Sequence, residues 1–406
     1  MSNTLLTMSM ITREALRVLE NTNKFTRQVN REYDDKFGVE GAKIGTTLNI
    51  RKPVRYVGTT GQALNIEGSQ ETQVALTLTT QFHVGISFSS ADLALKIDDF
   101  SKRFIKPAVA TIANKMDFDG LAQYKNVANY VGTPVTVPNA LLTYLQAGQL
   151  LDEEAVPVDD LRSIIMTPAM QVNIVDALKG LFQASGSIAA QYKSGRMGEA
   201  IGFDWVMDQN CNTHTIGALG GTPLVNGASQ TGTSIITDGW TSSAATRLLK
   251  GDIITFADVN AVNPQNRQST GSLRKFVVTA DTASDGSGNM TIPIYPALTP
   301  TGAFQTVTAS PADNAAILTF GQVSSTQNDV TPTGLALHRD AITMATADLP
   351  LPGGVDNAAR VSSKLAGISL RMVRAYDINT DLWPCRLDVL YGHQTIYPEF
   401  ACRIQS

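Results

Sequence analysis

From Val74 to Phe88 the chain reads VALTLTTQFHVGISF. Apolar and polar side chains alternate along it, and alternation with a period of two predicts a strand with one buried face. At about 3.3 Å per residue the strand would reach roughly 50 Å, whereas common strands have about 5–6 residues. Because a small domain does not cover such a strand, the stretch indicates a protruding hairpin arm.

A long helix is expected next. Ser90 suits its N-cap, Pro107 favours a kink because it lacks an N–H, and the helix should continue to about Tyr130 before Gly132 ends it. Two apolar stripes with helical spacing support it. They are Leu93, Ile97, Phe100 and Phe104, and then Ile105, Val109, Ile112 and Met116.

The totals of the chain limit its class. Its 406 residues are enough for two or three domains, and a hydrophobic content of 43% can form a sizeable core. A net charge of −4 disfavours a dedicated DNA-binding protein. Three cysteines without metal or redox spacing, the lack of a secretory signal and the lack of an apolar run long enough to span a membrane predict a soluble chain made in a reducing cytoplasm.

The segment before the hairpin has two interpretations. Thr12 suits the cap of a short helix with Ala15, Leu16 and Leu19, and the charged residues 30–37 have too little apolar surface to fold alone. We expect this N-terminal arm to dock on another surface; an ordinary solvated helix is the alternative.

Residues 45–57 predict the first half of the hairpin, interrupted by Pro53. Glycines between residues 58 and 72 indicate a mobile connection. Two adjacent strands of a β-sandwich are the alternative, and the long helix that follows favours the arm.

Residues 137–213 predict alternating helix and strand. Residues 139–154 fit a helix, 162–167 fit a short buried strand, and Pro168 opens another helix to about Phe182. The leucines of the first helix are expected to point inward: Leu141, Leu142, Leu145, Leu150 and Leu151.

From about His214 to Gly321 the chain turns rich in Gly, Ser, Thr and Asn, with short strands between turns. This predicts a small barrel or sandwich inserted into the α/β region. Its strands are expected at residues 253–256, 276–279, 291–295, 304–307 and 316–320. Near the end, strands at residues 368–372 and 385–390 should form a hairpin that pairs with the strand of residues 74–88.

No catalytic pattern stands out. Phosphate-loop, nucleophile-elbow and zinc-helix motifs are missing, and the four histidines, His83, His214, His338 and His393, are scattered. The segment from Asp281 to Asn289 lacks the ligand spacing of a calcium loop and fits a hairpin turn. We therefore predict a protein that is not an enzyme and that has no cofactor and no metal.

The order of these parts resembles the tailed-bacteriophage major capsid proteins with the Hong Kong 97-type fold, in particular the coat protein subfamily typified by phage P22, which carries an inserted β-barrel. The resemblance rests on GTTLNIRKP at residues 45–53, SFSSADL at 87–93, GFDWV at 202–206, KGDIITF at 250–256 and LHRDA at 337–341. One departure is that the family's acidic loop across the two-fold axis has only Asp238 as an acid here, between residues 227 and 246.

The resemblance implies an α+β fold with named parts. They are an N-terminal arm (1–42), an extended hairpin loop (43–88), a spine helix of the peripheral domain (89–136), an axial α/β domain (137–213), an inserted β-barrel (214–324), the return of the axial domain (325–354) and the terminal strands of the peripheral domain (355–406).

It also implies an icosahedral shell of hexamers and pentamers around double-stranded DNA that is contacted non-specifically, with a portal protein at one vertex and no membrane. Assembly is expected in the bacterial host cytoplasm with a separate scaffolding protein, since the chain lacks a charged helical extension at its N-terminus. No lysine lies between Lys52 and Lys96, so a shell without covalent cross-links is expected. Subunit contacts are expected at Arg51, Arg55, Tyr56, Glu67, Glu71, Arg31 and Tyr33.

Two other classes compete. A cellular encapsulin-like shell that holds enzyme cargo would share the fold, but the insertion and the long N-terminal arm favour a virus. An unrelated multidomain enzyme is disfavoured by the lack of any site motif.

Overall fold

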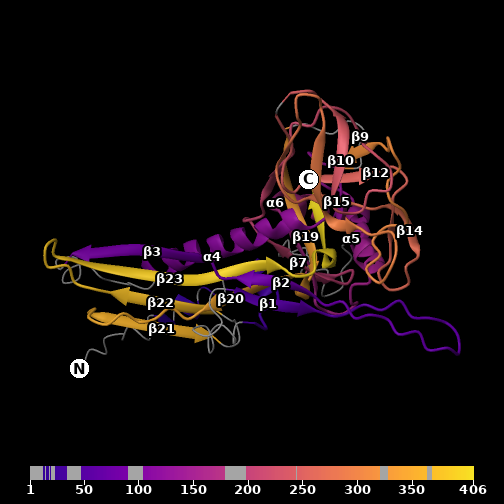
Figure 1. Cartoon of the computed structure of the whole chain (residues 1–406). Coiled ribbons are helices and arrows are strands. Elements are labelled where there is room, and N and C mark those ends of the chain that lie inside the picture. The colour runs from indigo at the N-terminus through magenta and orange to yellow at the C-terminus, as the bar shows by residue number, and fades with distance from the viewer. Residues whose placement is uncertain are drawn as a thin grey trace. The chain divides into compact units, whose positions relative to one another are not determined.

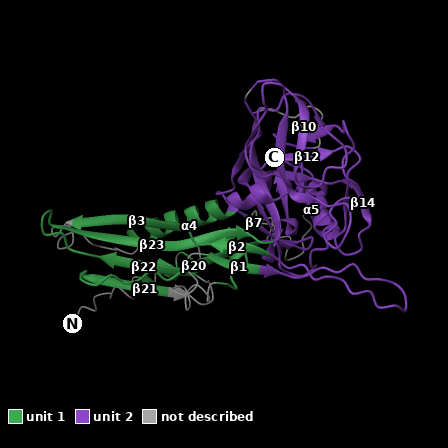
Figure 2. Ribbon diagram, viewed as in Figure 1, with its two compact units in different colours: residues 1–50, 73–120, 342–396 green, residues 51–72, 121–341, 397–406 purple. Residues whose placement is uncertain are grey.

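In the computed structural model of the chain (Figure 1), the described residues are 12–13, 15–17, 19, 23–33, 47–89, 104–178, 198–243, 245–320, 328–363 and 368–406. They form two compact units, coloured separately in Figure 2. Unit 1 comprises residues 1–50, 73–120 and 342–396, and unit 2 comprises residues 51–72, 121–341 and 397–406.

Unit 1 is built on a five-stranded antiparallel sheet. Its strands are β20 (Ile342–Ala347), β23 (Leu382–Thr395), β22 (Ile368–Arg374), β21 (Asn357–Ser363) and β3 (Thr80–Ser89). β23 pairs with β22 on one side and with β3 on the other, where the register runs from Leu382 opposite Ser89 to Tyr391 opposite Thr80. Figure 1 shows these long strands side by side. Both the terminal hairpin and its pairing with the early strand are thereby confirmed.

The early strand is divided, contrary to the prediction of one strand from Val74 to Phe88. β2 (Thr72–Thr77) pairs with β1 (Thr47–Lys52), whereas β3 pairs with β23. The chain changes partner at residues 78–79, where Gly392 lies so close that a Cβ there would meet the Thr77 carbonyl oxygen at 2.2 Å. The alternation reports which face is buried but not which strand is the neighbour. β1 ends at Lys52, before Pro53, which offers no N–H to a ladder.

Helix α4 (Lys106–Leu121) carries the second predicted stripe. Ile105, Val109, Ile112 and Met116 are at most 1% exposed, and the Tyr391 hydroxyl of β23 donates to Asp119 at 2.7 Å. The prediction of a helix to about Tyr130 was wrong, because a 3₁₀ turn (Ala122–Asn126) and the short strand β4 (Tyr130–Val131) follow α4. Helical hydrogen bonding changes from π to α type just before Pro107. The first stripe, up to residue 103, lies outside the described residues.

The N-terminal segment docks on its own chain within unit 1. Ala15, Leu16 and Leu19 are at most 5% exposed, so the solvated-helix alternative is wrong for these residues. Asp117 of α4 accepts backbone N–H bonds from Lys24 and Thr26 at 2.8 and 3.0 Å. The charged stretch from residue 34 onward lies outside the described residues.

Unit 2 contains a seven-stranded mixed sheet. Its strand order is β4, β24 (Ala401–Gln405), β19 (Val330–His338), β5 (Arg162–Met166), β7 (Phe203–Met207) and β6 (Gly198–Ala200), with β8 (Thr213–Thr215) beside β19. The predicted buried strand at β5 is confirmed, and all five of its residues are buried.

Two helices lie in the same unit, α5 (Leu141–Glu153) and α6 (Pro168–Leu178). The inward direction predicted for Leu142 and Leu145 was wrong: they are 63% and 42% exposed. α5 buries Tyr144, Ala147 and Leu151 instead, because a stripe that includes Tyr144 shifts the buried face by part of a turn. Among the described residues, no helix has the length and apolar character that a membrane span requires.

Unit 2 also contains a β-barrel. Its six strands are ordered β18 (Ile317–Thr319), β12 (Ile253–Phe256), β15 (Phe276–Val278), β17 (Met290–Leu298), β10 (Gly232–Trp240) and β9 (Gly221–Val225). A bridge between Leu224 and Ala316 and a hydrogen bond from Val225 N to the Ala315 carbonyl bring the two end strands together, so the sheet closes.

The barrel has an apolar core that includes Phe256, Phe276 and Ile292. The strand predicted at residues 304–307 is wrong, because this segment is a loop with one bridge from Val307 to Ala261. The smaller pairs β11 (Thr246–Leu248) with β16 (Thr282–Ala283), and β13 (Asn260–Val262) with β14 (Ser269–Leu273), flank the barrel strands in sequence.

Candidate subunit interface

Residues 51–72, called here the extended loop, connect β1 and β2 and include five of the seven residues predicted at subunit contacts. Polar contacts join its two sides. Arg51 lies 3.6 Å from Glu71, and the Tyr56 hydroxyl lies 3.1 Å from Ser69 Oγ. The Glu67 carboxylate accepts the backbone N–H groups of Val57 and Gly58 at 2.7 and 2.6 Å. These contacts define the shape of the loop without an apolar core.

The tip of the extended loop exposes apolar side chains. Leu64 is 87% exposed and Ile66 is 84% exposed; nearer the root, Tyr56 and Val57 are about half exposed. A concavity of about 470 Å³ lies between the two sides of the loop, lined in part by Tyr56, Leu64 and Glu67. Large apolar side chains gathered at one exposed place indicate a surface that a partner covers.

The root of the extended loop is charged and partly buried. Arg55 lies 3.5 Å from Glu399 and 5.9 Å from the Phe304 ring. The Lys52 ammonium lies 4.9 Å above the Tyr397 ring, and burial lowers the pKa of Lys52 although Glu399 acts in the opposite direction.

Arg31 and Tyr33, the other two predicted contact residues, belong to unit 1. Both are half-buried, and the Arg31 guanidinium donates to the Thr26 carbonyl five residues earlier. Part of the Arg31 side chain thus holds the N-terminal segment in place.

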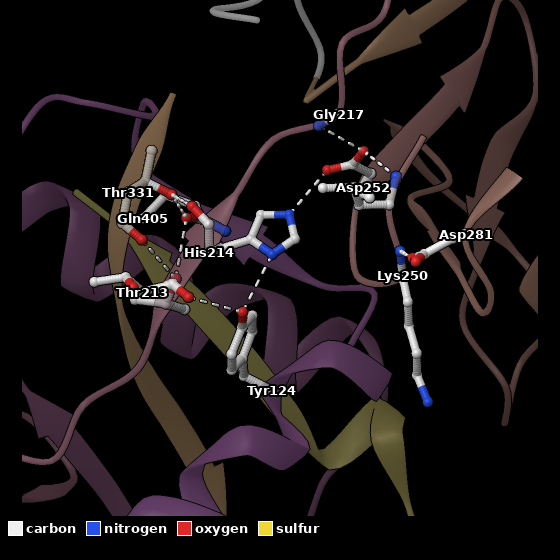
Figure 3. Close-up of polar contacts among 11 residues, drawn as sticks. Tyr124, Thr213, His214, Gly217, Lys250, Asp252, Asp281, Thr331 and Gln405 are labelled. Atoms are coloured by element: carbon white, nitrogen blue, oxygen red, sulfur yellow. Dashed lines mark hydrogen bonds and ion pairs between the residues drawn. The ribbon is translucent and has the colours of Figure 1, made fainter. Parts of the chain in front are cut away.

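A buried polar network lies where the chain enters the barrel (Figure 3). His214 Nε2 lies 2.9 Å from Asp252 Oδ1, and His214 Nδ1 lies 3.2 Å from the Tyr124 hydroxyl. Asp252 is fully buried and also accepts the N–H groups of Gly217 and Leu249 at 3.1 and 2.8 Å. A neutral ring with its proton on Nε2 satisfies both ring nitrogens, and burial lowers the pKa of His214. The network joins the segment that enters the barrel to the start of β12.

Arg403 of β24 lies fully buried on the other side of Tyr124, with its guanidinium carbon 5.7 Å from the ring centroid. Burial lowers its pKa to about 10. Its three side-chain nitrogens have no hydrogen-bond partner among the described residues. Arg403 therefore depends on the face of the Tyr124 ring for favourable contact.

The sequence predicted the residues of the loop but not the residues elsewhere in the chain that hold it. Glu399 and Arg267 contact the root of the loop, and Tyr295 binds Glu399. These three residues lie in separate parts of the chain with no shared pattern. His214 and Asp252 were visible only as a scattered histidine and as one letter of the KGDIITF motif. His83, expected on the polar face of its strand, is exposed on β3.

Comparison with known families places these features in context. The family model described as "P22 coat protein - gene protein 5" matches residues 40–404. The chain belongs to the P22 coat protein family. None of the curated proteins compared with it matches.

Several solved capsid structures are similar to the chain. A structure titled "Mycobacterium phage Che8" shows 11% identity and a TM-score of 0.46, covering 94% of this chain and 90% of its own. The capsid of Ralstonia phage GP4 shows 7% identity and a TM-score of 0.45, covering 94% and 88%. The CUS-3 coat protein I-domain shows 22% identity and a TM-score of 0.19, covering 25% of this chain and 96% of its own.

The family agrees with the predicted α+β Hong Kong 97-type fold. As a member of this family, the chain is a major capsid protein of a tailed double-stranded DNA bacteriophage and assembles into the icosahedral shell that encloses the genome. The encapsulin-like alternative is less favoured, because the matching family is a phage coat protein family. The family to which the chain belongs consists of structural coat proteins.

Proposed function

We propose that the extended loop is the part of this coat protein by which each subunit holds its neighbour in the shell. The carrying observation is the exposure of Leu64 and Ile66, at 87% and 84%, on a loop whose shape is already defined by contacts within it. A loop held in shape loses less conformational entropy on binding. Arg51, Arg55, Tyr56, Glu67 and Glu71 flank this apolar tip, and Arg31 and Tyr33 are proposed as a second contact surface.

The same proposal covers the remaining partners. The shell forms in the bacterial host cytoplasm with a separate scaffolding protein, carries a portal protein at one vertex and touches packaged double-stranded DNA without sequence preference. The net charge of −4 provides no strong basic field for phosphate contacts and so argues against tight, dedicated DNA binding. The lack of lysine between Lys52 and Lys96 supports a shell without covalent cross-links through the loop.

The domain division is likewise proposed: N-terminal arm, extended loop, spine, axial domain, inserted barrel and terminal strands. Closure of β9 against β18 supports the barrel as a separate folding element, because a closed sheet has no free edge.

Electron microscopy of shells from a Leu64→Ser, Ile66→Ser double variant tests the loop. Burial of two such side chains contributes about 1.5–3 kcal/mol each, so closed shells should be lost at concentrations where the original protein assembles. The unfolding free energy of the free subunit should change by less than about 0.5 kcal/mol. Normal shells from the double variant would contradict the proposal.

Val172→Ser on α6 is the matched control, since Val172 is also exposed, at 67%, and lies outside the proposed surfaces. The same microscopy, performed with the coat protein alone and with proteins encoded beside it, tests the scaffold. Uniform shells from the coat protein alone would contradict a separate scaffolding protein.

A further inference from the structure

Two cations at the root of the extended loop converge on one acid near the C-terminus. Arg55 lies 3.5 Å from Glu399 Oε1, and the charge of Glu399 also acts on Lys52. The Glu399 side chain is 14% exposed and that of Arg55 is 35% exposed, so the pair is screened less than a surface pair. Glu399 therefore attracts the loop close to the point where the chain leaves β1, just after Lys52 and Pro53.

The second oxygen of Glu399 is bound by the barrel. The Tyr295 hydroxyl of β17 donates to Glu399 Oε2 at 3.1 Å, and burial raises the pKa of Tyr295 well above its ordinary value. The phenol thus stays protonated and remains a donor. One carboxylate is shared between a barrel strand and the root of the loop.

Arg267, in the turn between β13 and β14, makes an independent contact. Its guanidinium donates to the backbone carbonyls of Tyr56 and Val57, the latter at 3.3 Å. These carbonyls lie next to the N–H groups that Glu67 binds. The Phe304 ring, from the loop after β17, lies under Arg55. Two segments of the barrel region, together with Glu399 before β24, thus reach residues 55–57.

We propose that residues of the barrel region, together with Glu399 before β24, act as an internal brace that fixes the direction of the extended loop in the free subunit, with Glu399 and Arg267 as its positioning residues. The brace comprises Glu399, Tyr295, Arg267 and Phe304. A solvated loop fluctuates when only its own polar contacts hold it, whereas the brace connects its root to β17, through Glu399 and Tyr295, and to the turn between β13 and β14, through Arg267. This inference rests on the proposed role of the loop in assembly.

A distance distribution between two spin labels tests the brace without assembly. Gln62→Cys on the loop and Ser234→Cys on β10 are both exposed positions within unit 2. Cys211 is replaced by alanine, because Cys385 and Cys402 are buried and Cys211 is only half-buried. In the free subunit, Glu399→Gln combined with Arg267→Gln should broaden the distribution about twofold or more. Glu71→Gln, which removes the exposed pair with Arg51 on the same loop, is the matched control and should leave the width unchanged.

Shells formed without labels by the same variants test the consequence. A broadened distribution with aberrant or missing shells supports the brace. An unchanged distribution overturns it, whether or not shells form. A broadened distribution with normal shells overturns the claim that the brace directs assembly. If the Leu64→Ser, Ile66→Ser variant forms no shells while its label-to-label distance distribution stays narrow, the tip binds the neighbouring subunit and the brace independently fixes the direction of the loop. Should the double variant not fold, Tyr295→Phe, which removes one hydroxyl, replaces Glu399→Gln in both measurements.

Discussion

The barrel and the extended loop belong to the same compact unit, but the barrel buries its apolar side chains and the loop exposes them. The barrel buries Phe256, Phe276 and Ile292 completely inside a closed sheet. The loop leaves Leu64 and Ile66 exposed to solvent. Its polar groups form hydrogen bonds between its two sides, as from the Val57 N–H to Glu67. Burial of apolar area is the main favourable contribution to folding, so the barrel contributes to the stability of the subunit. The loop has its apolar side chains available for another subunit.

The difference predicts that truncation of a buried barrel side chain lowers the unfolding free energy far more than truncation of an exposed loop side chain. Phe256→Ala removes a fully buried ring 5.2 Å from that of Phe276 and should lower the unfolding free energy by about 3–5 kcal/mol. Leu64→Ala should change it by less than about 0.5 kcal/mol. Urea unfolding of the free subunits measures both changes. Similar losses in the two variants would show that the loop is part of the folded core.

The sequence predicted the buried apolar faces of the fold better than the polar contacts of the loop. The spacing of Ile105, Val109, Ile112 and Met116 identified a buried helix face, since periodicity is a local property. It did not distinguish Leu142 and Leu145, which are exposed, from Tyr144, which is buried. It also missed the partner change at residues 78–79, because a pairing partner lies elsewhere in the chain.

The candidate interface shows the same limit. Arg51, Arg55, Tyr56, Glu67 and Glu71 could be named because they lie together on one loop. The residues that contact the loop from elsewhere in the chain could not be named. Arg267 donates to Val57 across 210 residues of sequence, and single polar residues carry no periodic signal. Only the tertiary fold brings Arg267 and Glu399 to the loop, and no local sequence pattern predicts this step.

A second prediction concerns pH at the entry to the barrel. Burial lowers the pKa of His214, whereas the unfolded chain binds the proton at about pH 6.5. The contribution of the neutral ring is therefore complete above that pH and is lost as the pH falls toward the lower folded pKa, by up to about 1.4 kcal/mol per pH unit. His214→Gln should flatten the fall in unfolding free energy between pH 7 and 5.

His393 contributes with the same sign, because burial lowers its pKa to about 4. Both proteins retain His393, so the difference between their pH curves isolates His214. Parallel curves for the original protein and His214→Gln would contradict the prediction and would mean that the network of His214 and Asp252 contributes equally in both charge states of the ring.

The smallest expected effect lies on the loop itself. The Arg51 and Glu71 side chains are 78% and 60% exposed and 3.6 Å apart, so Arg51→Gln should change the unfolding free energy of the free subunit by less than about 0.5 kcal/mol. A double-mutant cycle with Glu71→Gln, measured by urea unfolding at low and high salt, gives the coupling between the two charges. A coupling above about 1 kcal/mol would exceed the range of exposed pairs and would mean that the loop is stabilised within the subunit as the barrel is. A coupling near zero leaves the pair available to a neighbouring subunit, where removal of water would strengthen it.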